Sequence, residues 1–239
     1  MQYIPIHTRT LTPPQDDLFA VLDESLTDVK DSDVILITSK VVSIHHGCCV
    51  QIEGTDKEKL VAAEADGVQY VDYRDKPLTI VHNAFISSAG IDESNGNGYY
   101  VLLPESPYDD AKKIWQHLRT KHSVQNLGVI ITDSHSLPFR YGAMSIAIGF
   151  YGFHPVDSHR GKKDIFGREL KFSSTNIVDS LAAGSAVVAG ECDERQPVIV
   201  ARNVPNLVFI EDDARAELIV KREDDIYRGL FGGFTFKEK

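Results

Sequence analysis

The sequence predicts a soluble protein of the α/β type, in which strands and helices alternate along a single chain. Two observations support this prediction. The chain has 239 residues, of which 42% are hydrophobic and 25% charged, an ordinary globular composition that can bury one large core. Apolar, strand-like runs alternate with segments whose apolar residues recur at helical spacing. Because the sequence contains no repeat, low-complexity linker or long block of one charge, residues 1–239 are expected to form a single domain.

Charge and cysteine content argue against several classes of function. Thirty-five acidic residues against 25 basic ones give a formal net charge of −10, which disfavours binding to nucleic acid or to an anionic membrane. No apolar run reaches the ~18 residues of a membrane helix, and Met1–Thr12 lacks the layout of a signal peptide. Three cysteines make a poor disulfide framework. A cytoplasmic protein is therefore expected, with neither nucleic acid nor membrane as a partner.

The first half of the chain supplies three strands and two helices by pattern. Gln2–Ile6 is expected to be a short strand, and Asp33–Ser39 (DVILITS) has the apolar, β-branched composition of a buried strand. Thr12-Pro13-Pro14 is expected to open a helix, because four apolar residues follow at helical spacing. A short helix is expected at Lys57–Asp66 and a strand at Leu78–Ser88.

The middle of the chain continues the alternation. Tyr99–Leu103 is expected to be a strand, and Ser106-Pro107 followed by Asp109 has the capping residues of a helix start. Leu127–Thr132 (LGVIIT) is a second buried strand, which ends at Asp133-Ser134.

The C-terminal part carries five further predictions. Strands are expected at Met144–Phe150, Pro197–Ala201 and Val208–Ile210, and helices at Ile177–Val188 and Asp213–Leu230.

Familiar catalytic signatures are absent from the sequence. It contains no Walker phosphate loop, no G-x-G-x-x-G after a strand, no C-x-x-C, no H-E-x-x-H and no G-x-S-x-G. Any chemistry must therefore use loop carboxylates, arginines and backbone amides.

Three acidic positions stand where polar loops leave apolar segments. Asp92 lies in a loop of small and polar residues that includes Asn95, with hard oxygen donors suited to Mg²⁺ or Mn²⁺. Asp133 follows a buried strand at its carboxyl end, a favoured ligand position in open sheets. Glu191 follows a helix rich in small residues. Each has an ordinary alternative, because acids also occupy solvated turns and cap helices.

Basic residues gather between residues 140 and 202 of this acidic chain. They are Arg140, Arg160, Lys162, Lys163, Arg168 and Arg202. Arginine pairs bidentately with carboxylates or phosphates, so a loop around an anionic substrate is one interpretation. An exposed charged turn with internal ion pairs is the other.

Several segments match, in order, the motifs of one known family. They are Asp33–Ser43 (DVILITSKVVS), Ala89–Asn95 (AGIDESN), Leu102–Pro104 (LLP), Gly128–Asp133 (GVIITD), Ala147–Gly149 (AIG), Arg160-Gly161 and Asp164–Leu170 (DIFGREL). Each motif is modest alone, but the ordered set, covering residues 1 to about 203, is specific. By these motifs the chain resembles the coenzyme F420-0:L-glutamate ligases, also called γ-glutamyl ligases.

The resemblance implies a fold and a set of ligands. The fold is α+β, with mixed sheets and packed helices in an intertwined, two-lobed subunit that forms a homodimer. The metal ligands for Mg²⁺ or Mn²⁺ would be Asp92, Asp133, Ser134 and Glu191. The nucleotide, GTP or ATP, would contact Thr8, Arg9, Thr10, Leu11, Thr38, Ser39, Lys40, Asn95 and Gly190. The family often uses K⁺ as well.

The implied reaction joins L-glutamate to a small carboxylate acceptor, which would be coenzyme F420-0 or a related glutamyl or folate-type compound. Because a carboxylate is a poor electrophile, it is first converted to an acyl phosphate, and the amine of glutamate then attacks. Metals and arginines neutralise the charge of the anions that must meet. We expect Arg140, Arg160 and Arg168 to clamp phosphates or carboxylates and so to be catalytic.

Departures from the family pattern leave a second interpretation open. Leu137 stands where the family has an arginine, Ser134 replaces a threonine, Ile44 replaces a lysine, and Thr8-Arg9-Thr10 replaces a Gly-Ile/Leu-Pro segment. These changes predict either the same chemistry on a different acceptor or with a different nucleotide, or a non-catalytic protein that binds a nucleotide or metabolite.

Overall fold

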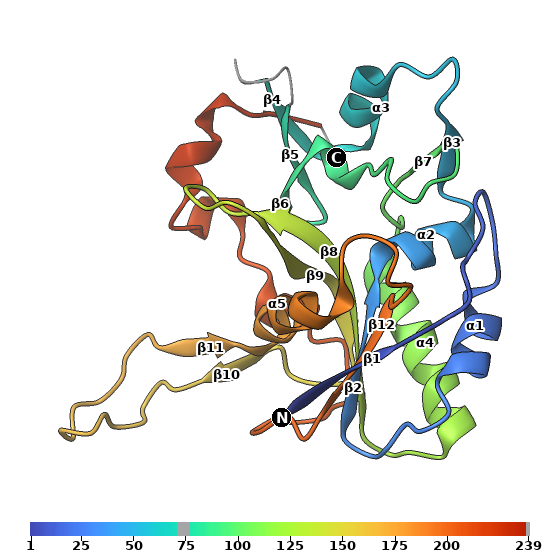
Figure 1. The fold of residues 1–239 in the computed structure, drawn as a ribbon. Coiled ribbons are helices and arrows are strands. Elements are labelled where there is room, and N and C mark those ends of the chain that lie inside the picture. The colour runs from blue at the N-terminus through green and yellow to red at the C-terminus, as the bar shows by residue number, and fades with distance from the viewer. Residues whose placement is uncertain (71–76, 238–239) are drawn as a thin grey trace.

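A computed structural model describes residues 1–70 and 77–237, and its centre is a mixed five-stranded sheet (Figure 1). The strands follow the order β1-β12-β2-β8-β9. Their bounds are β1 Gln2–Ile6, β12 Val198–Arg202, β2 Asp33–Thr38, β8 Leu127–Ser136 and β9 Ala143–Tyr151. Only β2 and β8 run parallel, with Thr38 opposite Thr132, so both strands end at the same edge of the sheet.

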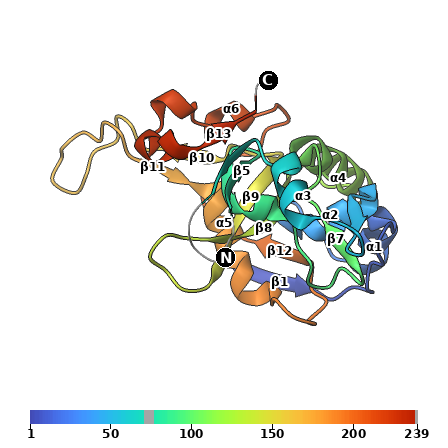
Figure 2. The ribbon, with the colours of Figure 1, turned by 90° about the horizontal axis from the view of Figure 1, so that it is seen from above.

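Helices cover both faces of this sheet, because its central strands are apolar on both sides. One face packs against α1 Leu18–Ser25, α2 Ser39–His46 and α4 Pro107–His122. The other face packs against α5 Ile177–Ala189. Figures 1 and 2 show α5 on one side of the sheet and α1, α2 and α4 on the other.

A smaller set of elements, here called the second lobe, lies beyond the end of β8 (Figure 1). Its four-stranded sheet has the order β13-β4-β5-β6, with β13 Thr235–Phe236, β4 Gly67–Gln69, β5 Leu78–Val81 and β6 Ala84–Ser87. It also contains α3 Lys57–Glu64, the 3-10 turn η1 Ser88–Gly90, and the pair β3 Cys49–Gln51 and β7 Tyr99–Val101. Residues 71–76 lie outside the described part of the chain.

An arm projects from the body between residues 156 and 176 (Figures 1 and 2). Strands β10 Val156–Ser158 and β11 Ser174–Asn176 pair antiparallel at its base. Ile165, Phe166 and Phe172 on the arm are exposed.

The predicted α+β class with mixed sheets and packed helices is confirmed, and four element predictions were wrong in detail. The first helix begins at Leu18 because the Asp17 carboxylate accepts hydrogen bonds from Phe19 N and Ala20 N. Residues 78–88 form a hairpin rather than one strand, since His82 and Asn83 adopt positive φ. Val208–Ile210 makes only one bridge, between Phe209 and Phe153.

The predicted helix at Asp213–Leu230 is also wrong. The segment contains the short helix α6 Arg215–Leu218 and the 3-10 turns η2 Arg222–Asp224 and η3 Arg228–Gly233. Its larger apolar side chains, such as Val220 and Ile226, are exposed, so no continuous stripe holds a longer helix against the core. Among the described residues, no helix is long and apolar enough to span a bilayer.

Candidate functional site

A cavity of about 940 Å³ opens where the carboxyl edge of the central sheet meets the second lobe. The central sheet and its loops supply residues around Thr8–Leu11, Thr38–Ile44, Thr132–Ser134 and Ser185–Pro197, and the second lobe supplies residues around Ser87–Asn95. All of the predicted nucleotide-contacting residues and all four predicted metal ligands line it: Thr8, Arg9, Thr10, Leu11, Thr38, Ser39, Lys40, Asn95, Gly190, Asp92, Asp133, Ser134 and Glu191. These five chain segments, which are distant in sequence, therefore share one cavity.

Asp133 lies at the end of the parallel strand pair. Strand β8 continues past it to Ser136, so Asp133 is held inside a strand and not in a loop. Its Oδ1 accepts a hydrogen bond of 2.8 Å from Ser39 Oγ at the start of α2. Burial raises the pKa of Asp133 to about 6, and the negative charge of Asp92 adds to this rise, whereas the Ser39 hydrogen bond opposes it. The two predicted metal-binding carboxylates are thus close enough to repel each other.

Asp92 enters the cavity from the second lobe and is already neutralised by a cation. Its Oδ2 lies 2.5 Å from Lys40 Nζ, and its Oδ1 accepts hydrogen bonds of 2.9 Å from the backbone N–H and hydroxyl of Ser94. Burial raises the pKa of Asp92, but the hydrogen bond and charge of Lys40, with the Ser94 bonds, outweigh it and hold the pKa below its usual range. Lys40 also donates to the Ser94 carbonyl at 2.8 Å, so it fixes this loop.

Asn95 connects the two walls of the cavity. It adopts a positive φ of 56°, and its Nδ2 donates to the carbonyl of Cys192 at 3.0 Å. Cys192 adjoins Glu191 in the exposed loop after α5. The predicted nucleotide contact Asn95 therefore positions the loop that carries the predicted metal ligand Glu191.

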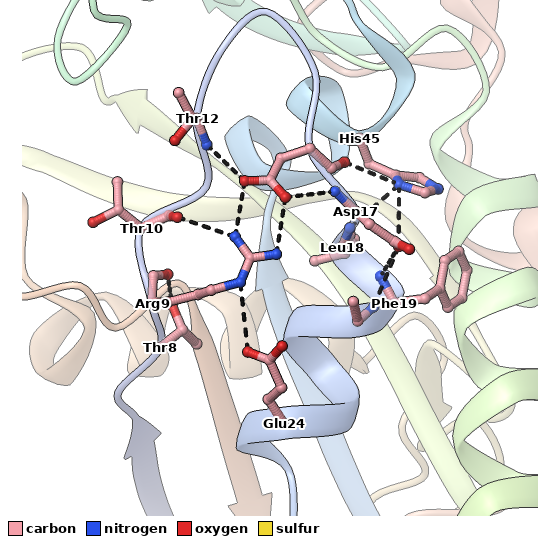
Figure 3. Close-up of polar contacts among 11 residues, drawn as sticks. Thr8, Arg9, Thr10, Thr12, Asp17, Leu18, Phe19, Glu24 and His45 are labelled. Carbon is pink, nitrogen blue, oxygen red and sulfur yellow. Dashed lines mark hydrogen bonds and ion pairs between the residues drawn. The ribbon is translucent and has the colours of Figure 1, made fainter.

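The segment Thr8–Leu11 is tied to the same loop, and its one charged side chain is engaged. Thr8 N donates to the carbonyl of Arg195 at 3.0 Å. The Arg9 guanidinium makes a bidentate pair with Asp16 at 2.8 and 2.9 Å and lies 3.5 Å from Glu24 (Figure 3). Because the charge of Arg9 is already paired, the segment Thr8–Leu11 offers a ligand mainly its backbone and hydroxyl groups.

The predicted catalytic arginines lie outside the cavity of their own subunit. Arg140 is exposed in the turn between β8 and β9, and its Nη1 donates to the neighbouring Phe139 carbonyl. Arg160 and Arg168 are exposed on the projecting arm. The structure does not bring these three side chains together with Asp92 and Asp133.

Arg202, which also stood out in the sequence, has a structural role. Its guanidinium donates to both carboxylate oxygens of Asp33, at 2.9 and 2.8 Å, and to Asp28. Asp33 is buried, and these bonds raise the pKa of Arg202. The side chain therefore fastens β12 to the start of β2.

Two cationic residues of the cavity were missed by the sequence interpretation. Lys57, at the start of α3, lies 3.6 Å from Glu93, and its ammonium stands 4.9 Å from the centre of the Tyr100 ring. Arg195 follows the loop that contains Glu191. Neither belongs to a recognisable motif, and only the position of Arg195 four residues after Glu191 could have suggested it.

The cavity offers the oxygen donors that a hard divalent cation prefers. In the described part of the chain, these donors do not form a preassembled metal site. Asp92, Asp133, Ser134 and Glu191 offer only oxygen atoms, as Mg²⁺ and Mn²⁺ prefer. In the described part of the chain, however, no three His, Cys, Asp or Glu side chains are gathered so as to hold a metal ion. Mg²⁺ usually binds through one or two carboxylates plus substrate phosphates, so the residues fit a metal that arrives with a phosphate ligand.

Fold and cavity together define an α+β protein in which carboxylates and backbone-rich loops line one cavity. A family model described as F420-0:Gamma-glutamyl ligase matches residues 6–203. The chain belongs to this family, as its motifs predicted.

Relatives from methanogens are similar over most of their length. A coenzyme F420:L-glutamate ligase of Methanopyrus kandleri is 32% identical, over 94% of this chain and 96% of its own. Enzymes of the same name from Methanococcus maripaludis and Methanocaldococcus jannaschii are each 34% identical, over 84% of this chain and 86% of their own.

Proposed function

We propose that the protein is a ligase that forms an amide bond between L-glutamate and a small carboxylate acceptor, at the cost of a nucleoside triphosphate. The relatives' names supply glutamate and the coenzyme F420 class of acceptor. The observation that carries the proposal is the single cavity that collects the family's nucleotide segments together with Asp92, Asp133 and Glu191. GTP is the expected nucleotide, Mg²⁺ or Mn²⁺ the expected metal, and K⁺ an accessory ion.

The reaction needs no protein nucleophile. An oxygen of the acceptor carboxylate attacks the γ-phosphorus, the bond to the β-phosphate oxygen breaks, and an acyl phosphate and a nucleoside diphosphate result. The amine of glutamate then attacks the acyl carbon, phosphate leaves, and the nitrogen loses a proton. A bound divalent metal would neutralise the phosphate charge. The chain's own residues position the reactants, as positioning and electrostatics dominate phosphoryl transfer.

The carboxylates have separate tasks in this proposal. Asp133, held by Ser39, and Asp92, held by Ser94, would bind the metal from the two walls. Lys40 keeps the Asp92 loop in place and brings positive charge to the cavity. Asn95 holds the loop of Glu191 against the second lobe.

The three arginines predicted to be catalytic are assigned to a homodimer. Arg140 lies between β8 and β9, and Arg160 and Arg168 lie on the arm, all outside the cavity of the same chain, so their proposed place is the cavity of a second copy. The homodimer and the single-domain organisation of residues 1–239 both remain predictions.

The test is incubation with GTP or ATP, Mn²⁺, L-glutamate and candidate acceptors, read by mass spectrometry. A product one glutamyl unit heavier than coenzyme F420-0, a folate or a glutamyl peptide is expected. Asp92→Asn and Asp133→Asn should abolish it while the variants still fold. Saturable nucleotide binding without phosphate release, with every acceptor, would instead identify a non-catalytic binding protein.

A further inference from the structure

The cationic side chains of the cavity differ in whether an acid already neutralises them. Four line it: Arg9, Lys40, Lys57 and Arg195. The first three lie within 3.6 Å of the carboxylates of Asp16, Asp92 and Glu93, respectively. Within residues 1–70 and 77–237, no carboxylate lies within ion-pair distance of the Arg195 guanidinium. Among these residues, the Arg195 guanidinium is therefore the cation of the cavity that no carboxylate neutralises.

The adjacent carboxylate, that of Glu194, is engaged within its own loop. The Glu194 carboxylate turns back onto its own loop and accepts a hydrogen bond of 2.8 Å from Cys192 N. It packs so closely that a Cβ added at Gly190 would lie 2.2 Å from the Glu194 carboxyl carbon. Gly190, which also has a φ of +76°, therefore allows Glu194 to fold inward, away from Arg195.

The backbone of Arg195 is fixed at the position where two nucleotide segments meet. Arg195 adopts a φ of 53°, a left-handed conformation that non-glycine residues adopt only when their surroundings impose it. Its carbonyl accepts the Thr8 N–H bond at 3.0 Å, so the residue joins the loop after α5 to the loop after β1. The side chain starts from an anchored point, although it is itself exposed.

The charges that line the cavity would disfavour a triphosphate unless an unpaired cation such as Arg195 contacts it. Six acidic residues line it, two more than the basic ones: Asp92, Glu93, Asp133, Glu191, Asp193 and Glu194. A triphosphate would be repelled unless cations meet it on each side. Arginine offers several N–H donors in a planar fork that matches phosphate oxygens.

We propose that Arg195 binds the phosphate chain of the nucleotide at this site. The inference rests on the proposed function, because it takes the ligand to be a nucleoside triphosphate. Arg195 would supply a phosphate contact from within the chain that forms the cavity, in addition to any contact from Arg140, Arg160 and Arg168 of a second copy. Lys57 is the weaker candidate because Glu93 and Tyr100 hold its ammonium.

The experiment measures equilibrium binding by calorimetry with Mn²⁺ present. The variants are Arg195→Gln, the charge-preserving Arg195→Lys, and the control Arg228→Gln, an exposed arginine outside the cavity. The ligands are GTP, ATP, inorganic tripolyphosphate and guanosine. Arg195→Gln should weaken triphosphate and tripolyphosphate binding about tenfold, as expected for loss of a charged, bidentate contact. Arg195→Lys should recover part of the loss, and Arg228→Gln should bind like the wild type.

The outcomes separate the inference from the proposed function. If the wild type binds GTP or ATP and Arg195→Gln binds it equally well, the inference is wrong and the function stands. If the wild type binds tripolyphosphate but no nucleotide, both the function and the inference are contradicted, because the inference takes the ligand to be a nucleoside triphosphate. Absence of both kinds of binding contradicts both. An Arg195→Gln variant that raises only the KM for glutamate would assign Arg195 to a carboxylate and overturn the inference. Unchanged thermal melting shows that each variant folds.

Discussion

The hydroxyl of Ser39 donates a hydrogen bond of 2.8 Å to Oδ1 of Asp133, across 94 residues of sequence. The contact exists because the parallel pairing of β2 and β8 ends at Thr38 and Thr132, so that Ser39, which begins a helix, lies beside Asp133. This hydrogen bond orients the Asp133 carboxylate, whose ionisation is opposed by burial and by the negative charge of Asp92.

Removing that hydroxyl should therefore weaken metal binding. Ser39→Ala leaves Asp133 free to rotate, and loss of such a supporting hydrogen bond typically costs 10–100-fold in metal affinity. We expect about a tenfold weaker affinity for Mn²⁺ with nucleotide present, measured by calorimetry. The matched control is Ser43→Ala on the same helix, because Ser43 Oγ is buried and has no hydrogen-bond partner among residues 1–70 and 77–237. Equal Mn²⁺ affinity in the Ser39→Ala variant and the wild type would show that Ser39 does not support a metal ligand.

The pair of Arg9 and Asp16 predicts a pH-dependent contribution to stability. Hydrogen bonds from the Arg9 guanidinium and from Thr12 N lower the pKa of Asp16 in the folded protein, against a smaller opposing effect of burial. The folded state then binds a proton less readily than the unfolded state, so the stabilisation is present above the unfolded pKa of about 4 and is lost on acidification. Asp16→Asn should lower the free energy of unfolding by about 1 kcal/mol at pH 7, a modest value because Arg9 is partly exposed to solvent.

Urea titrations of the wild type and Asp16→Asn between pH 3 and pH 8 measure this difference, which should shrink as the pH falls below about 4. Asp212→Asn is the control, because the exposed Asp212 makes no hydrogen bond or ion pair in the described structure. A difference that stays constant over the pH range would mean that the carboxyl's ionisation does not stabilise the fold.

Close packing around Gly149 predicts that a larger residue at this position destabilises the protein. A Cβ at this position would lie 2.5 Å from the backbone C and O atoms of Pro107, where α4 begins against β9. Because neither backbone can move freely, Gly149→Ala should destabilise the protein by about 1–3 kcal/mol, with Tm lowered by several degrees. Gly229→Ala is the control, since an added Cβ there meets nothing within 4 Å. Equal melting temperatures for Gly149→Ala and the wild type would exclude this close packing.

The sequence predicted the residues of the cavity better than it predicted the surface of the protein. Strands β2, β8 and β12 are apolar runs that only a buried sheet accommodates, so their positions, and hence the place of Asp133, could be predicted. Local pattern could not show that Lys40 meets Asp92, or that Arg195 meets Thr8, because both depend on pairing between distant segments.

Charge clustering in the sequence did not indicate which basic residues line the cavity of one chain. Arg140, Arg160 and Arg168 gather along the chain but lie on projections of the fold, and Arg202 is occupied by the buried Asp33. Apolar residues such as Val220, Ile226 and Leu230 of the predicted helix at 213–230 are exposed, and nothing in their spacing shows that the core does not reach them.

The arm arginines give the final prediction, which joins their role to the homodimer. If Arg160 and Arg168 act on the cavity of a second copy, the double variant Arg160→Gln/Arg168→Gln and the variant Asp92→Asn should each be inactive alone. In a mixture of the two, each mixed dimer contains one intact site, made of Asp92 from one chain and the arm of the other. Random exchange should therefore restore about a quarter of the wild-type activity, because a symmetric dimer has two equivalent sites and half of the dimers are mixed. Light scattering must show a dimer in each sample, and co-expression ensures exchange. If confirmed mixed dimers are inactive, the arginines do not act on the cavity of a second copy. If the double variant is active, Arg160 and Arg168 are not needed for catalysis.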